Sequence, residues 1–197
     1  MTLDNAKTYF KNRIDELKRL SRDKSQVNPW IFVCASAFID YLAKIVNGQD
    51  MQGSGYKGFI SDYLSIINPV YKTFTYKNGK QDLPDQMYHV LRCGILHSFS
   101  FIPDSKSSKS GGRLRSIVLC HADERDRKGW RHLMSYPPSG STHPTSVTDA
   151  ALFVAEDFID DLENVVNHIF CQASTDSALK TKIKDWTHKH PPIMGNI

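Results

Sequence analysis

Apolar residues recur every three or four positions through most of this chain, which is the spacing of one face of an α-helix. The pattern predicts helices over residues 2–22, 28–46, 59–67, 82–98, about 149–171 and 175–190. Asn28-Pro29 and Asp82-Leu83-Pro84 each place a capping residue ahead of a first-turn proline, and Asn47-Gly48 is a stop signal. The sequence therefore predicts a mainly α fold, an up-and-down helical bundle, in one domain over residues 1–197.

The run from Trp30 to Val46 is apolar on nearly every side and predicts a buried central helix. Because it contains Asp40 and Lys44 and is short for a bilayer span, no membrane association is expected. The two charged residues lie four positions apart on one helical face and can pair. Such a pair can line a cleft, or it can lie at the edge of the helix, where most such pairs are found.

Three further segments show local signals of their own. The glycine-rich stretch from Gln49 to Gly58 predicts a flexible connection, since it lacks the Gly-Lys-Ser/Thr ending of a phosphate loop. Residues 70–76 predict a short extended piece. Residues 146–149 resemble a capping box that would start the helix reaching Cys171.

The strongest strand signal lies after the fourth helix. Residues 114–121 predict a strand, residues 123–129 a charged turn, and residues 130–136 a returning strand. We therefore expect a β-hairpin near residues 113–136, inside a loop and hairpin insertion of about residues 101–145. Its basic side chains are candidates for phosphate contacts: Arg113, Arg115, Arg125, Arg127, Lys128 and Arg131.

Composition fits a folded intracellular protein. The chain is 40% hydrophobic and 11% aromatic, which supports a real core. The four cysteines are far apart with no Cys-x-x-Cys pair, so reduced thiols and a cytoplasmic location are expected. The N-terminal residues do not form a signal peptide.

Charge is unevenly distributed along the chain. The net charge is +4, but residues 148–171 carry six Asp or Glu and no Lys or Arg. Residues 1–24 and 98–147 carry the excess of basic residues. A basic face suits a phosphate-bearing partner, although ordinary solvated surfaces give the same pattern. The acidic helix could keep nucleic acid elsewhere or dock a basic partner.

Arg92 and His97 stand five residues apart near the end of the predicted helix over residues 82–98. They stand beside the apolar stripe of Met87, Val90 and Leu91, in a chain of mostly helical pattern. This Arg-x4-His arrangement resembles the motif of the HEPN superfamily. The resemblance covers the helical parts of the chain. It implies a small helical bundle, often a metal-independent ribonuclease of toxin–antitoxin, abortive-infection or other defence systems.

The two residue types suit RNA cleavage without metal. The 2′-hydroxyl must lose a proton to attack the adjacent phosphorus, and the leaving 5′-oxygen must gain one. His97 can move these protons near pH 7, and Arg92 can hold the phosphoryl oxygens as negative charge develops. The hypothesis names Arg92 and His97 as catalytic, with Cys93, Arg113, Arg115 and Arg131 binding substrate. No cofactor or metal is expected.

Helix geometry constrains this pair. On a regular α-helix, five residues correspond to about 7.5 Å of rise and about 140° of rotation, so the two side chains are not neighbours. Either the helix unwinds near Gly94 or His97, or a second copy completes the site about a two-fold axis. The resemblance implies the second arrangement, a homodimer, with an antitoxin as a further protein partner.

Two alternatives use the same residues. His89, Cys93 and His97 lie at four-residue spacing, so two of them could bind one metal ion, although no second ligand cluster accompanies them. The protein could also be a non-catalytic HEPN-like module that binds RNA or another protein. The histidines at 121, 132 and 143 are expected at the surface and receive no role. Sequence motifs of other enzyme classes, such as Gly-x-Ser-x-Gly and His-Glu-x-x-His, do not occur.

Overall fold

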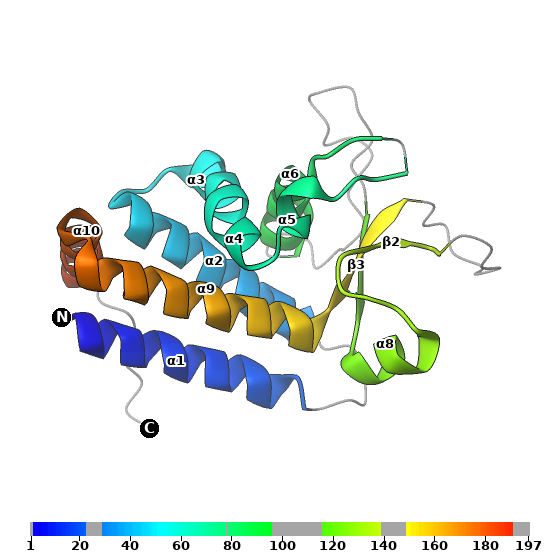
Figure 1. The fold of residues 1–197 in the computed structure, drawn as a ribbon, viewed down its shortest axis with the longest axis horizontal. Helices are drawn as coiled ribbons and strands as arrows, with labels where there is room; N and C mark the ends of the chain where they lie inside the picture. The colour runs from blue at the N-terminus through cyan, green and yellow to red at the C-terminus, as the bar shows by residue number, and fades with distance from the viewer. Residues whose placement is uncertain (1, 23–28, 78, 96–115, 139–148, 191–197) are drawn as a thin grey trace.

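The protein is mainly helical, with a small three-stranded sheet at one end of the helical body (Figure 1). The computed structural model describes residues 2–22, 29–77, 79–95, 116–138 and 149–190. Three long helices lie side by side, with α1 antiparallel to the other two. They are α1 (Leu3–Leu20), α2 (Pro29–Asn47) and α9 (Ala155–Thr175). The last helix, α10 (Ser177–Lys189), packs against all three.

A layer of short helices lies on the side of α2 and α9 away from α1 (Figure 1). Two of its members, η1 and η2, are π-helical, a winding with i→i+5 hydrogen bonds that recurs at functional sites. The layer consists of α3 (Gln52–Phe59), η1 (Ile60–Leu64), α4 (Ser65–Ile67), α5 (Val70–Thr73), α6 (Leu83–Gln86) and η2 (Met87–Ile95).

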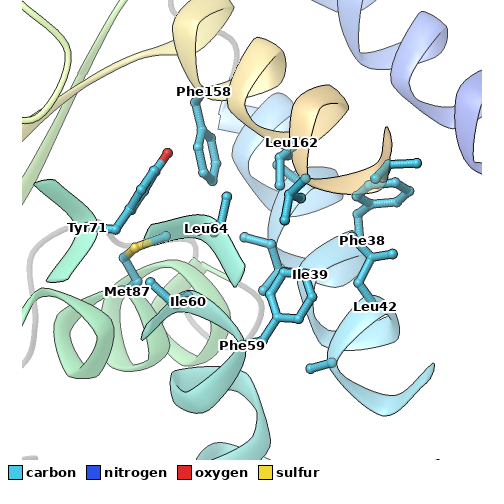
Figure 2. Close-up of a cluster of buried hydrophobic side chains, with 14 of the residues drawn as sticks. Phe38, Ile39, Leu42, Phe59, Ile60, Leu64, Tyr71, Met87, Phe158 and Leu162 are labelled. Atoms are coloured by element: carbon cyan, nitrogen blue, oxygen red, sulfur yellow. The ribbon is translucent and has the colours of Figure 1, made fainter. Parts of the chain in front are cut away.

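The hydrophobic core lies where these layers meet. Figure 2 shows side chains from α2, α9 and the short helices converging there; the labelled ones include Phe38, Ile39, Leu42, Phe59, Ile60, Leu64, Phe158 and Leu162. Along α1 the buried residues are Ala6, Phe10, Ile14 and Leu17. The three-and-four spacing therefore identifies the buried face of α1, whereas Leu20, which continues the spacing, is exposed.

Local capping and backbone conformation explain where several helices begin and end. Thr2 caps α1, since its hydroxyl accepts a hydrogen bond from the Asn5 N–H at 3.1 Å. α2 begins at Pro29 and ends at Asn47, and Gly48 follows with a φ of 73°, the left-handed conformation that favours glycine. α6 begins directly after Asp82, whose side chain makes no capping hydrogen bond.

Helix α2 is, within the described residues, the one helix long and apolar enough to cross a membrane by length and composition. Ten of its residues are buried inside the protein. Its neighbours are α1, α3, α9, α10 and η2. This burial is what the sequence predicted for a central core helix.

The sheet has the strand order β1-β3-β2. β1 (Ser116–Cys120) runs parallel to β3 (Ala150–Val154), and β2 (Met134–Tyr136) runs antiparallel to it. Ala151 and Phe153 of β3 belong to the helical core, whereas the alternate residues Ala150, Leu152 and Val154 pack in a second cluster with Cys120 and Tyr136. Both faces of β3 are therefore covered, which explains its five consecutive buried residues.

The predicted β-hairpin is wrong. The strand signal over residues 114–121 and the returning strand near residue 136 both correspond to strands, but each pairs with β3 and not with the other. The segment expected as a charged turn is helix α8 (Ala122–Lys128), which ends at Gly129 with a φ of 66°. A parallel partner needs a crossover connection, and α8 lies in that connection.

Three further boundaries differ from the prediction. Residues 150–154 form β3, so α9 begins at Ala155 and not at the expected capping box, whose residues 146–148 lie outside the described part of the chain. Most of the glycine-rich stretch is helix α3. Residues 70–73 form α5, and residues 74–76 belong to neither a helix nor a strand.

Part of the negative charge of the acidic helix is neutralised within the protein. Lys18 of α1 pairs with Glu163 at 2.6 Å and with Asp160 at 3.4 Å. Arg125 of α8 pairs with Asp157. Carboxylates of α9 thus hold α1 and α8 in place, which leaves less charge for the basic partner that the sequence suggested.

Candidate functional site

Helix η2 carries Arg92 at the boundary between core and solvent. Met87, Val90 and Leu91 of this helix are buried, as the apolar stripe predicted. Arg92 extends toward α2, where its Nε–H donates to Asp40 Oδ1 at 3.2 Å. The contact joins residues 52 positions apart in the chain and ties the predicted motif helix to the central helix.

Asp40 binds a second cation through its other oxygen. Lys44 Nζ lies 2.9 Å from Asp40 Oδ2, so the predicted pairing of these two residues is confirmed. Lys44 Nζ also lies 3.5 Å from Asp50 Oδ2. The side chains of Asp40, Lys44 and Arg92 are 17%, 23% and 26% exposed. This group, here called the Asp40 cluster (Asp40, Lys44, Asp50 and Arg92), therefore lies at an edge that solvent can reach.

Charge pairing dominates the electrostatics of the Asp40 cluster. Partial burial lowers the pKa of Arg92, but the hydrogen bond to Asp40 and its negative charge more than offset this, so the pKa is raised. Burial also lowers the pKa of Lys44, but its hydrogen bonds to Asp40 and Asp50 and their negative charges outweigh this, so the pKa is raised. The pKa of Asp50 is lowered, chiefly by the Gln52 N–H that donates to it, and further by Lys44. These shifts keep Arg92, Lys44 and Asp50 ionised at neutral pH.

Tyr88 extends the cluster along η2. The Arg92 Cζ atom lies 5.6 Å from the centre of the Tyr88 ring and the Lys57 Nζ lies 5.8 Å from it, both within cation–π range. Lys57 also pairs with Asp85 at 3.0 Å. Three cations, Lys44, Lys57 and Arg92, thus each face a carboxylate on one side of the molecule.

The layer beneath the cluster is buried and hydrogen-bonded. The hydroxyl groups of Ser36 on α2 and Tyr56 on α3 lie 2.9 Å apart. Burial raises the pKa of Tyr56, so its hydroxyl stays neutral at physiological pH. This pair joins α2 to α3 below Asp40 and gives the charged groups a fixed support.

The sequence-predicted site residues have different outcomes. Cys93 is half-buried beside Arg92, and its thiol interacts with Tyr88 and Arg92. Arg131 is exposed on the turn before β2, where its N–H contacts Met134 Sδ at 3.2 Å, and the described residues include no contact that links it to the Asp40 cluster. His97, Arg113 and Arg115 lie outside the described residues, so their predicted roles stay predictions.

Arg125, one of the residues expected to contact phosphate, is already paired with carboxylates. Arg125 binds Asp157 and Asp126, and these hydrogen bonds raise its pKa. The contact with Asp157 holds α8 against α9. Arg127 and Lys128 of the same helix are exposed, with Lys128 Nζ 6.0 Å from the centre of the Trp130 ring.

Two histidines expected at the surface are buried. His121 lies against Glu156, with Nδ1 2.9 Å from Oε1, and the other oxygen of this carboxylate accepts the Ala122 N–H at 2.9 Å. His132 accepts the Val154 N–H at 3.0 Å and approaches the Tyr71 hydroxyl at 3.2 Å. Both join the sheet region to the helices. His143 lies outside the described residues.

The described part of the chain contains no group of three or more His, Cys, Asp or Glu side chains that could hold a metal ion. His89, one of the residues considered as a metal ligand, has its Nε2 atom 3.7 Å from Asp85 Oδ2, which is too far for a hydrogen bond. Comparisons of the chain with protein-family models, curated proteins and solved structures found no match. The geometry of the Asp40 cluster is therefore the basis for a functional proposal.

Sequence reasoning missed the Asp40–Arg92 contact and the role of Tyr88. The sequence does contain one signal of such a contact, a carboxylate and a lysine inside an otherwise apolar helix. Buried charges require partners, so these two residues indicate that a charged partner lies nearby. The sequence does not identify that partner. A permanently charged guanidinium fixed at one edge and reachable by solvent can bind an anion such as a phosphoryl group.

Proposed function

We propose that the protein is a HEPN-like, metal-independent endoribonuclease in which Arg92 holds the phosphoryl oxygens of RNA and His97 transfers protons. The observation that carries the proposal is the hydrogen bond from Arg92 Nε to Asp40, at a position 26% exposed. A guanidinium has five N–H donors, and this contact uses the one on Nε. A charge fixed in this way needs little reorganisation as the phosphorane forms.

Helix η2 is π-helical from Met87 to Ile95, a segment that contains Arg92, whereas His97 lies beyond the described residues. In an α-helix two residues five apart are separated by about 140° around the axis. A π-helix closes each hydrogen-bonded ring one residue later, which brings residues five apart toward a common face. The motif spacing therefore suits a helix wound in this way better than it suits a regular α-helix.

The remaining parts of the proposal concern partners. RNA is the substrate, with Cys93, Arg113, Arg115 and Arg131 as further contacts. A homodimer about a two-fold axis would bring two copies of the motif helix around one cleft. An antitoxin, or another protein of a defence or abortive-infection system, is the expected protein partner, and the cytoplasm is the expected location.

The test is cleavage of a mixed RNA substrate in EDTA. Wild type is compared with Arg92→Ala and His97→Ala, and with Arg19→Ala as a matched control, because Arg19 is exposed on α1. We expect wild type and the control to cut and both motif variants to lose cleavage by at least about 100-fold. Cleavage that persists in Arg92→Ala, or that requires a divalent metal, contradicts the proposal.

A non-catalytic HEPN-like module is the second candidate function. It is favoured by one observation, that Lys44, Lys57 and Arg92 each already face a carboxylate, which weakens attraction for a polyanion. A thiol at residue 93 also donates only weak hydrogen bonds to a phosphate. A module of this kind would bind RNA or protein without cutting, and its expression would be harmless with or without Arg92→Ala.

A further inference from the structure

We infer that Tyr88 and Gly53 are positioning residues for Arg92. The ring of Tyr88 restrains the guanidinium through a cation–π contact, and Gly53 supplies the space in which that ring lies. The inference rests on the proposed function for its catalytic consequence, but the positioning itself can be measured without any substrate.

The guanidinium of Arg92 is restrained from two directions. Asp40 accepts the Nε–H at 3.2 Å, which restrains one edge of the planar group. Tyr88, one turn earlier on η2, lies 5.6 Å from Cζ, as ring centre to atom. A single hydrogen bond leaves a planar group free to rotate about the bond, whereas a second contact, with the Tyr88 ring, restricts its orientation.

Tyr88 is held in turn by α3. Its ring centre lies 5.8 Å from that of buried Tyr56, and the Lys57 ammonium group lies within 5.8 Å of it. The closest approach is to Gly53, near the start of α3. A Cβ atom built on Gly53 would lie 2.7 Å from Tyr88 Cζ and 3.0 Å from both Cε1 and the hydroxyl oxygen.

The approach at Gly53 leaves no room for a methyl group. Carbon atoms in non-bonded contact prefer a separation of about 3.5–4.0 Å. The Tyr88 ring is rigid beyond its two side-chain torsions, so Gly53→Ala must rotate the ring or move α3 away from η2. Either movement disturbs the cation–π contact between the Tyr88 ring and Arg92.

A matched control exists on the same helix. A Cβ built on Gly58 meets only Asp62 Oδ2, at 3.9 Å, an ordinary contact distance. Gly58→Ala therefore makes the same chemical change on α3 and does not disturb Tyr88. The difference between the two glycine variants reports the Tyr88 contact and not the stability of α3.

The first measurement is the order of the Arg92 side chain by ¹⁵N relaxation of its Nε–Hε group, assigned with Arg92→Lys. We expect an ordered signal in wild type, Gly58→Ala and Tyr88→Phe, and a mobile one in Gly53→Ala and Tyr88→Leu. Urea midpoints of all variants establish that each is folded. If Gly53→Ala does not fold, Tyr88→Leu decides the same question. An equally ordered Arg92 in Tyr88→Leu overturns the inference.

The second measurement is RNA cleavage. A shift of about 1 Å in a catalytic group can lower the rate by about 100-fold, so we expect kcat to fall between about 10- and 100-fold in Gly53→Ala and Tyr88→Leu, with KM nearly unchanged. Tyr88→Phe keeps the ring face and most of the rate.

A double-mutant cycle separates positioning from general damage. Gly53→Ala should cost nothing further in the Tyr88→Leu background, because the ring it displaces has already been removed. Equal losses in both backgrounds contradict the inference. If wild type does not cut RNA, the proposed function fails, but the order of Arg92 in the variants still decides whether Tyr88 and Gly53 position it.

Discussion

His132 should make the stability of the protein depend on pH. Its side chain is buried, with the ring centre 5.3 Å from that of Phe153. Nδ1 accepts the Val154 N–H, so the neutral ring carries its proton on Nε2, which faces the Tyr71 hydroxyl at 3.2 Å and Asp161 Oδ2 at 3.6 Å. Burial, and to a lesser extent the positive charge of Arg125, lower the pKa of His132 to about 3.

The direction in which pH changes the free energy of unfolding follows from proton binding. Between pH 6.5 and about pH 3 the unfolded chain protonates this histidine and the folded chain does not, so the free energy of unfolding falls as pH falls. The full difference is on the order of 5 kcal/mol, and it is reached only near pH 3. Burial raises the pKa of Asp161, which acts in the opposite direction at the acid end. We therefore expect a net loss of about 2 kcal/mol between pH 7.5 and pH 4.5.

The assay is urea unfolding at pH 7.5, 6.0 and 4.5. His132→Gln removes the titrating group, and His188→Gln changes an exposed histidine on α10 as the control. His132→Gln should be less stable than wild type at pH 7.5, since the Val154 N–H and the Tyr71 hydroxyl lose a partner. The gap should narrow by about 2 kcal/mol at pH 4.5. A gap that does not change with pH would refute the reasoning.

Three further predictions concern the Asp40 cluster, the core and the thiols. Asp40→Asn should lower the free energy of unfolding by about 1–2 kcal/mol, since Arg92 loses its partner but stays partly hydrated; the urea midpoint measures this. Phe158→Ala removes a fully buried ring and should cost about 3–5 kcal/mol, measured by thermal unfolding. Burial raises the pKa of Cys120 to about 12, so iodoacetamide at pH 8 should modify exposed Cys171 and not Cys120, as peptide mass mapping would show.

The long helices could be predicted from the sequence because their signals are local. The repeat of Ala6, Phe10, Ile14 and Leu17 identifies the buried face of α1 without knowledge of its partners. The limits of α2 follow from Pro29 and from Gly48, which suit those positions by their own conformational preferences.

β3 could not be distinguished from helix in this way. Ala151, Leu152 and Ala155 fit helical spacing, and a short apolar run buried on both faces has no period of its own. β1 was recognised, but its partner was not, since pairing depends on residues more than 30 positions away. The glycines of α3 likewise suggested a loop, although packing against α2 and Tyr88 favours a helix there.

The candidate site was predictable only in part. Arg92 and the Asp40–Lys44 pair each stood out as charges among apolar residues. Their contact depends on how α2 packs on η2, and the support from Tyr88 depends on the space at Gly53. Contacts of this kind come from tertiary packing, which local patterns do not record.

In the proposed function, Arg92, held by Asp40, stabilises the attack of an RNA 2′-hydroxyl on the adjacent phosphate. The most direct measurement is end-group analysis of products formed in EDTA from a single-stranded RNA, beside the same strand with a 2′-deoxy residue at the cut position. The account predicts 2′,3′-cyclic phosphate ends, no cut at the deoxy position, and no products with Arg92→Ala. Products with 3′-hydroxyl ends, or equal cutting at the deoxy position, would contradict it.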